Sequence, residues 1–308
     1  MRPVLTPNLI YPRYPSVAPS ASEAFLGKVS FGDVVPLRPL SEKRVEVWPA
    51  LSALTHGSSG AFTFTHDGEM LFASASFAES KPIEQVAREA YDQAIALIRS
   101  QGYPQFLRIW NHVGRINEIE LGRERYQSFC MGRYDAFAAA GLHDTDLPSA
   151  SAVGTPGWGL MIYFLASRTP GVQVENPRQV AAYLYPPQYG PKPPSFSRGT
   201  VVRGPEASAV YISGTSSVLG HASVHAGDVL DQLDETLRNV EAVLQRAIPG
   251  AGLSDLVSVK TYLRRGEDAA AVQPRLTAAL PRGCEQILLE ADICRSELLL
   301  EIEGVAKR

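Results

Sequence analysis

The sequence lacks the short motifs that most often reveal a function. Its 308 residues contain no glycine-rich phosphate loop, no Gly-x-Ser-x-Gly elbow and no Cys-x-x-Cys pair, which excludes the commonest nucleotide-binding, serine-hydrolase and zinc-binding patterns. The three cysteines are odd in number and widely spaced, so a disulfide framework is not expected. We expect neither a cofactor nor a metal.

Strong charge and long apolar runs are also missing. The 29 basic and 32 acidic residues give a net charge of −3 with no basic block, so nothing favours nucleic acid as a partner. No apolar run approaches the roughly 20 residues of a membrane-spanning helix. The N-terminus has no apolar segment typical of a secretory signal. These features predict a cytoplasmic protein that has neither a membrane nor a nucleic-acid partner.

The order of the predicted elements repeats along the chain. Each half has a β-hairpin or strand followed by helix, strand, helix and two further strands, which predicts an α+β or α/β fold with a mixed sheet and helices on one face in each half. In the first half we expect helices at 83–98 and 121–140 and strands at 106–110, 160–166 and 179–185. In the second half we expect helices at 229–247 and 268–280 and strands at 209–213, 256–263 and 286–290, followed by the terminal strand.

These patterns divide the chain into an N-terminal half at 1–185, a proline-rich connecting loop at 186–200 and a C-terminal domain at 201–308. The first 55 residues predict short strands and a wrapping arm. No role is assigned to residues 1–60.

The last stretch, Cys294 to Ala306, is the one around which the chain is organised. Its alternation predicts a strand with Leu298, Leu300 and Ile302 on one face and Glu301 and Glu303 on the other. A solvated outer face of a sheet would explain the two glutamates. The alternative is that one of them points into a covered cleft, where loss of water raises its pKa and makes it a proton donor.

Two other segments have both a structural and a functional explanation. The proline-rich loop is either a linker or the wall of a pocket, and its Tyr185, Tyr189, Phe196 and Arg198 favour the wall. A metal pair formed by two histidines at 221 and 225 would need helical spacing, but the flanking glycines predict a loop. In that loop, Asp228 would cap the following helix.

Arginines are the better candidates for ligand binding because planar guanidinium groups suit carboxylates. Several of them flank predicted strands or lie near tyrosines. They are Arg123, Arg133, Arg198, Arg264 and Arg295.

The second half resembles the RidA/YjgF superfamily, in Tyr211 to Thr215, in the helix around Asn239, in Val259 to Thr261 and in the terminal Leu300 to Ala306. Over roughly residues 100 to 308 the chain resembles the chorismatases. The motifs are Gly132 to Phe137, the proline-rich wall through Arg198, Ile212 to Thr215 with Gly220 and His221, and Cys294 and Arg295 before Glu301. The resemblance implies two RidA/YjgF-like, that is chorismate-mutase-like, halves.

The resemblance further implies an enzyme that converts chorismate to 3-hydroxybenzoate, with or without 4-hydroxybenzoate, and to pyruvate. In such an enzyme Glu301 delivers a proton to the enolpyruvyl group and the neighbouring ring hydroxyl displaces pyruvate. Glu303 would be structural. Gly214 and Cys294 match the residues that accompany the benzoate-forming chemistry, whereas an inert core thiol is the other reading of Cys294.

The expected substrate contacts, to which Gly214 also belongs, are Arg123, Arg133, Tyr183, Tyr189, Arg198 and Arg264. Three alternatives stay open: hydrolysis of chorismate to a dihydroxycyclohexadienoate, a RidA-like imine deaminase, and a non-catalytic module that binds a small molecule. An arginine in the penultimate strand would support the deaminase, but Glu285 and Gln286 stand there. The sequence is compatible with both a homotrimer and a monomer.

Overall fold

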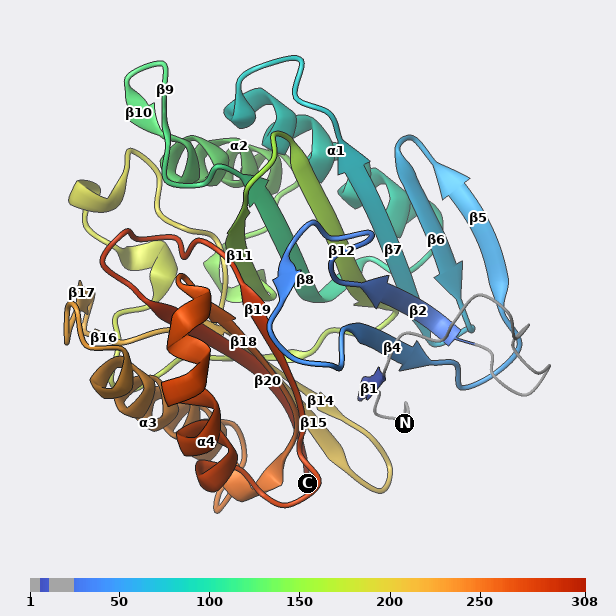
Figure 1. Cartoon of the computed structure of the whole chain (residues 1–308). Helices are drawn as coiled ribbons and strands as arrows, with labels where there is room; N and C mark the ends of the chain where they lie inside the picture. Colours follow the sequence, from blue (N-terminus) through green and yellow to red (C-terminus); the bar gives the residue numbers. More distant parts are fainter. Residues whose placement is uncertain (1–5, 11–24) are drawn as a thin grey trace.

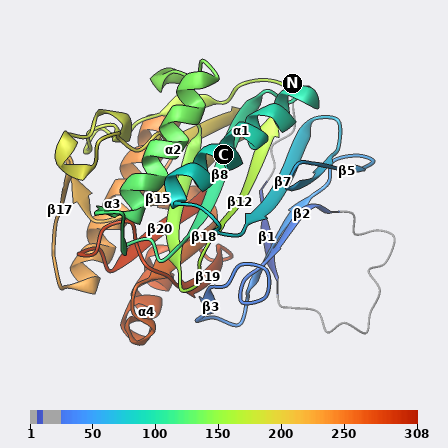
Figure 2. The same cartoon turned by 90° about the horizontal axis from the view of Figure 1, so that it is seen from above.

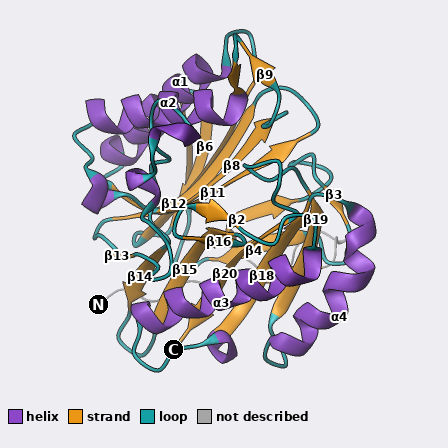
Figure 3. Ribbon diagram, turned by 90° about the vertical axis from the view of Figure 1, so that its left-hand side faces the viewer, coloured by secondary structure: helices purple, strands orange, loops and turns teal. Residues whose placement is uncertain are grey.

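Two mixed β-sheets lie face to face in the structure, and a pair of helices covers the outer face of each (Figures 1 and 3). The structure is a computed structural model, and it describes residues 6–10 and 25–308. Pro12, Tyr14 and the rest of 11–24 lie outside the described residues. No helix in the described part of the chain is long and apolar enough to cross a membrane.

The first half forms a six-stranded sheet in the order β11-β8-β12-β7-β6-β5. Only β11 and β8 are parallel neighbours. The helices α1 and α2 connect β7 to β8 and, through a short hairpin of β9 and β10, β8 to β11. The bounds are β5 Thr55–Ser59, β6 Phe62–His66, β7 Met70–Phe77, α1 Ile83–Ser100, β8 Gln105–Gly114, β9 Ile119–Glu120, β10 Arg123–Glu124, α2 Arg125–Ala139, β11 Ser149–Thr155 and β12 Leu160–Ser167.

The second half repeats this topology. Strands β14-β15-β20-β18-β19 correspond in order and direction to β6-β7-β12-β8-β11, and α3 and α4 take the places of α1 and α2. The bounds are β13 Val172–Val174, β14 Gly199–Arg203, β15 Ser208–Thr215, β16 Val218–Leu219, β17 Ala222–Ser223, α3 Val229–Ala247, β18 Leu256–Leu263, α4 Ala269–Ala279, β19 Glu285–Glu290 and β20 Leu300–Lys307. Short 3-10 helices lie at Asp144–Asp146, Ala182–Leu184, Pro187–Tyr189, Leu253–Asp255 and Gly266–Asp268.

The prediction of an α+β fold made of two similar halves is thus confirmed. The boundaries at 185 and 201 stay a prediction. The second sheet also includes β13 and, at its far edge, β3 (Arg38–Pro39), which pairs with β19. The other N-terminal strands, β1 (Asn8–Ile10), β2 (Phe25–Ser30) and β4 (Val45–Pro49), form a three-stranded sheet. Its buried residues Leu26, Val29 and Trp48 join the core between the two large sheets.

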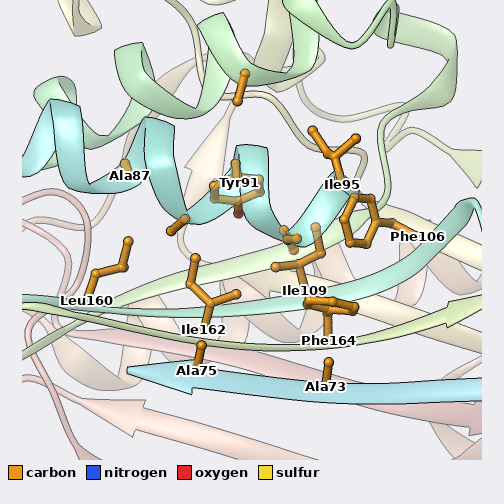
Figure 4. Packing of buried hydrophobic residues seen from close by; sticks show 14 of the residues in the cluster. Ala73, Ala75, Ala87, Tyr91, Ile95, Phe106, Ile109, Leu160, Ile162 and Phe164 are labelled. Carbon is orange, nitrogen blue, oxygen red and sulfur yellow. The ribbon is translucent and has the colours of Figure 1, made fainter. Parts of the chain in front are cut away.

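Side chains alternate between the two faces of each strand, and the buried apolar side chains form three separate cores. On β12, Ile162 and Phe164 face the helices α1 and α2, whereas Met161 and Tyr163 face the other sheet. Figure 4 shows Tyr91 of α1 packing over the helix-facing side chains of this sheet. A third core lies between α3, α4 and the second sheet.

The two helices of the first half approach each other closely (Figure 2). A Cβ atom at Gly132 of α2 would lie 2.0 Å from the carbonyl oxygen of Glu84 on α1. Glycine is therefore required where the helices meet, because no side chain fits between the two backbones.

Three local predictions were wrong. Residues 179–185 form a 3-10 turn at Ala182–Leu184, not a strand, since prolines follow directly. The second helix begins at Arg125, because residues up to Glu124 belong to the β9–β10 hairpin. The last strand begins at Leu300, and Leu298 packs between the sheets rather than beside Leu300.

A buried polar cluster links the two sheets around Glu303 of β20. Its carboxylate accepts hydrogen bonds from Arg108 (2.6 Å) and Trp110 (2.7 Å) of β8 and pairs with Lys260 of β18 at 2.7 Å. Burial opposes the charge of this carboxylate, but Lys260 and Arg108 outweigh it and lower the pKa of Glu303 to about 2. Lys260 also pairs with Glu46 of β4 at 3.0 Å. The cluster therefore joins both halves and the N-terminal sheet.

Replacing Glu303 by glutamine should lower the free energy of unfolding at pH 7 by roughly 3–5 kcal/mol, because two buried cations lose their shared counter-ion. Chemical denaturation followed by circular dichroism measures this. Arg88→Gln, which breaks the exposed pair with Asp92, is the control and should change stability by less than about 1 kcal/mol. Equal effects of the two variants would contradict the importance of the buried cluster.

Candidate active site

A cavity opens where the two halves meet, beside β11 of the first sheet and β15 and β20 of the second. The space in and at the mouth of this cavity amounts to about 770 Å³, which includes open solvent. Its lining comes from β10, the helix α2, the strands β11, β15, β16 and β20, the proline-rich segment and the loop before β20. The lining residues are Glu124, Tyr126, Arg133, Ala150, Ser151, Ala152, Tyr185, Tyr189, Pro194, Phe196, Arg198, Gly214, Ser216, Val218, Cys294, Arg295, Leu298 and Glu301.

Glu301 points into this cavity from β20. Its side chain is buried, at 4% exposure, and its Oε1 atom has no hydrogen-bond partner among the described residues. Burial, reinforced by the negative charge of Glu303, raises the pKa of Glu301 to about 8, although Arg108 and Arg198 oppose the shift. Near neutral pH this carboxyl therefore carries a proton that it can donate.

Gly214 provides the space that the Glu301 carboxyl occupies. A Cβ atom at position 214 would lie 2.0 Å from Oε1 of Glu301 and 3.2 Å from the Ser151 hydroxyl. Any larger residue would force the carboxyl to move. Gly214 thus controls the position of the acid directly.

Two buried arginines in the cavity have unused donors. Arg133 of α2 is 1% exposed, and its Nε and Nη2 atoms lack partners among the described residues. Arg198 donates through Nη2 to the Tyr185 hydroxyl (2.7 Å). Its Nε atom has no hydrogen-bond partner among residues 6–10 and 25–308. Because buried guanidinium groups need counter-ions, the cavity is suited to an anionic ligand.

An aromatic wall supports a third arginine. The Arg295 guanidinium lies 4.0 Å from the ring centre of Tyr189 and 5.1 Å from that of Tyr185. It also donates to the carbonyl oxygen of His221 at 2.8 Å, and the Tyr189 hydroxyl lies 3.1 Å from Nδ1 of His221. The proline-rich loop therefore presents rings to the cavity, as a pocket wall would.

Cys294 lies in the cavity wall beside the acid. Burial, and then the nearby Glu301, raise the pKa of its thiol to about 12. The thiol therefore stays neutral and is a poor nucleophile. Its contribution in this position is shape and weak polarity.

Three predicted contact residues do not line the cavity. Arg123 lies on β10 and approaches Glu84 at 3.6 Å, and Tyr183 packs against the core of the first half. Arg264 instead holds the loop before β20, because it donates to the carbonyl oxygens of Ile293 and Arg295, both at 2.9 Å. The structure brings together the remaining six: Glu301, Cys294, Gly214, Arg133, Tyr189 and Arg198.

Sequence reasoning missed other lining residues, among them Glu124 and Ser151. Both lie on short or unpredicted strands, and no pattern in the sequence marked them. Tyr185, which favoured a pocket wall in the sequence, does line the cavity. No group of metal-binding side chains occurs in residues 6–10 and 25–308. Asp228 caps α3 as predicted, by accepting from the backbone of Leu230 and Asp231.

Comparisons with known proteins show which family the sequence and the fold resemble. Residues 46–166 match the family model described as "Chorismatase FkbO/Hyg5-like, N-terminal". A 3-hydroxybenzoate synthase of Streptomyces hygroscopicus is 38% identical over 280 residues, which are 87% of this chain and 82% of that protein. A chorismatase of the same organism is 36% identical, over 86% of this chain and 79% of that protein.

A crystal structure of a chorismatase superposes on this chain with a TM-score of 0.86 and 29% sequence identity. The superposition covers 98% of both chains. The fold is therefore shared over nearly the whole length of the chain.

The raised pKa of Glu301 predicts a pH dependence of stability. The folded chain keeps a proton that the unfolded chain releases above the ordinary pKa of 4.5. The free energy of unfolding should therefore be greatest below pH 4.5 with respect to this group and should fall as pH rises to about 8, by up to about 1.4 kcal/mol per pH unit.

The Glu301→Gln variant has no titratable group at this position, so its stability is compared with that of the wild type. The stability of the variant relative to the wild type should increase between pH 4.5 and 8 and then level off, as measured by urea denaturation across this range. A constant difference would show that Glu301 titrates normally.

Proposed function

The chain belongs to the chorismatase family, and we propose that it converts chorismate to 3-hydroxybenzoate and pyruvate. Chorismate, C₁₀H₁₀O₆, has the same atoms as the two products together, C₇H₆O₃ and C₃H₄O₃. The reaction therefore needs no water, oxidant or cofactor overall. It needs an acid for the enolpyruvyl methylene carbon and a site that holds two carboxylates.

The observation that carries this proposal is the buried Glu301 carboxyl in the lining of the cavity, whose Oε1 atom has no partner among the described residues. Its pKa of about 8 and its unpartnered oxygen suit a group that gives a proton to carbon at neutral pH. Protonation of the methylene group makes the enolpyruvyl carbon strongly electron-poor and weakens its ether bond to the ring. We assign the role of general acid to Glu301.

The two carboxylates of chorismate would meet the buried arginines. Arg198, whose charge acts on Glu301, is near enough to the acid to hold the enolpyruvyl carboxylate. Arg133, whose Nε and Nη2 atoms have no partner among the described residues, would hold the ring carboxylate. Tyr189 and Arg295 would cover the ring. The neutral thiol of Cys294 would leave the charge balance of this arrangement unchanged.

The intramolecular route is favoured over hydrolysis by one comparison and by one expectation from the family resemblance. The relative named 3-hydroxybenzoate synthase is 38% identical to this chain, and the resemblance implies that residues such as Gly214 and Cys294 accompany benzoate formation. In this route the ring hydroxyl next to the ether displaces pyruvate, and a short-lived arene oxide rearranges to 3-hydroxybenzoate. Attack by water would instead give a dihydroxycyclohexadienoate, and a different rearrangement would give 4-hydroxybenzoate.

Incubation of the purified protein with chorismate should release 3-hydroxybenzoate and pyruvate in equal amounts, as resolved by liquid chromatography. Glu301→Gln should lower kcat at least about 10³-fold, because the amide keeps the shape of the side chain but cannot act as a general acid. Absence of pyruvate with the folded wild-type protein would refute the proposed function. An unchanged rate for the variant would show that another group is the acid.

Cys294→Ala should keep pyruvate release within about tenfold while the product shifts toward the dihydroxycyclohexadienoate, because the smaller side chain leaves room for water beside Glu301. Chromatographic product ratios measure this. Cys284→Ala, a thiol outside the lining of the cavity, is the matched control and should leave the ratio unchanged. A product ratio that does not respond to Cys294→Ala would remove the steering role.

A further inference from the structure

A second carboxyl group in the cavity, Glu124, has no role in the chemistry described so far. It is the last residue of β10 and stands at the N-cap position of α2, yet its side chain makes no capping hydrogen bond to the helix. It forms no ion pair within residues 6–10 and 25–308. A side chain that neither caps its helix nor pairs with a cation is available to a ligand.

A chain of hydrogen bonds fixes the orientation of Glu124. Its Oε1 atom accepts from Nδ2 of Asn117 at 2.9 Å. The Oδ1 atom of Asn117 accepts from Arg264 at 3.1 Å. Because a guanidinium group can only donate, Arg264 determines which way the Asn117 amide faces, and the amide N–H is directed at Glu124.

Arg264 is itself held firmly. Besides Asn117, it donates to Asp292 (2.7 Å) and to the carbonyl oxygens of Ile293, Arg295 and Leu298 (2.9, 2.9 and 2.8 Å). These bonds use all five of its N–H groups. Arg264 therefore supports both Glu124, through Asn117, and the loop that carries Cys294.

The charge of Glu124 is unfavourable for binding alone. The proposed substrate carries two carboxylates, and a third carboxylate in the cavity wall repels them. Burial raises the pKa of Glu124 despite the Asn117 hydrogen bond, which makes this carboxyl a better proton acceptor than an exposed one. A group that weakens binding and is nonetheless carefully oriented fits a catalytic role.

We propose that Glu124 is the catalytic base that accepts the proton of the attacking ring hydroxyl; this rests on the proposed function. After Glu301 has protonated the methylene carbon, the hydroxyl oxygen bonds to the ring carbon that carries the ether. The ether bond breaks, its electron pair goes to the oxygen that becomes the pyruvate ketone, and the hydroxyl proton passes to Glu124. Glu124 returns this proton to the oxygen as the arene oxide opens, and the proton lost from the ring carbon restores Glu301.

Glu124→Gln tests this role. It should lower kcat by at least about 10²-fold and should lower KM, because a repulsive charge is removed. The remaining product should shift toward the dihydroxycyclohexadienoate, since water no longer competes with an activated hydroxyl. Glu124→Asp, which keeps the carboxyl, should recover at least about tenfold of the lost kcat.

The control is Glu297→Gln, which removes the same charge from an exposed position close enough to raise the pKa of Glu124. It should keep kcat within about twofold. Binding can also be measured without turnover: in the Glu301→Gln background, Glu124→Gln should lower the Kd for chorismate in calorimetry. A residue with only a structural role would raise it.

The outcomes separate the two proposals. If the wild-type protein releases no pyruvate, the proposed function fails. If the wild type is active and Glu124→Gln keeps kcat within threefold, or if the double variant binds chorismate more weakly, Glu124 is not the base and the proposed function stands.

Discussion

The ion pair of Glu303 with Arg108 and Lys260 is the interaction on which the rest of the structure depends. Arg108 comes from the first sheet, Lys260 and Glu303 come from the second, and Lys260 reaches on to Glu46 of the N-terminal sheet. Buried charges are costly unless they are paired and hydrogen-bonded. The two sheets are therefore held in one mutual position, and the cavity between them has a fixed shape.

The same cluster makes two neighbouring carboxyl groups chemically different. Glu301 and Glu303 lie on one face of β20 and are both buried, but the two cations act mainly on Glu303. Its permanent negative charge then helps to raise the pKa of Glu301. One glutamate is a fixed anion and the other a neutral acid, which is a known way to obtain acid catalysis near neutral pH.

Periodicity in the sequence was sufficient to predict the two halves and the terminal strand, because apolar alternation records which face of an element is buried. It could not separate Glu301 from Glu303, since their difference arises from Arg108 and Lys260, which are distant in sequence. Only the family resemblance distinguished them. Arg264 shows the same limit of sequence reasoning. An arginine beside a predicted strand suited a ligand contact, but in the structure its five hydrogen-bond acceptors come from Asn117 and from the loop at 292–298.

The duplicated fold has an acid in one half only. In the second half, Glu301 pairs across the sheet with Tyr262 and Glu303 with Lys260. In the first half, β12 and β8 form the strand pair that corresponds to β20 and β18. There Met161 pairs with His112 and Tyr163 with Trp110. Met161 thus takes the place of the acid, and Tyr163 stacks on Trp110 at 4.6 Å.

Met161, Tyr163 and Trp110 belong to the core between the sheets. The second half contributes the acid together with Arg198 and Arg295 to the cavity wall. The first half contributes Arg133, Ser151 and Glu124. Because residues of both halves line the cavity, the site exists only at the junction between them.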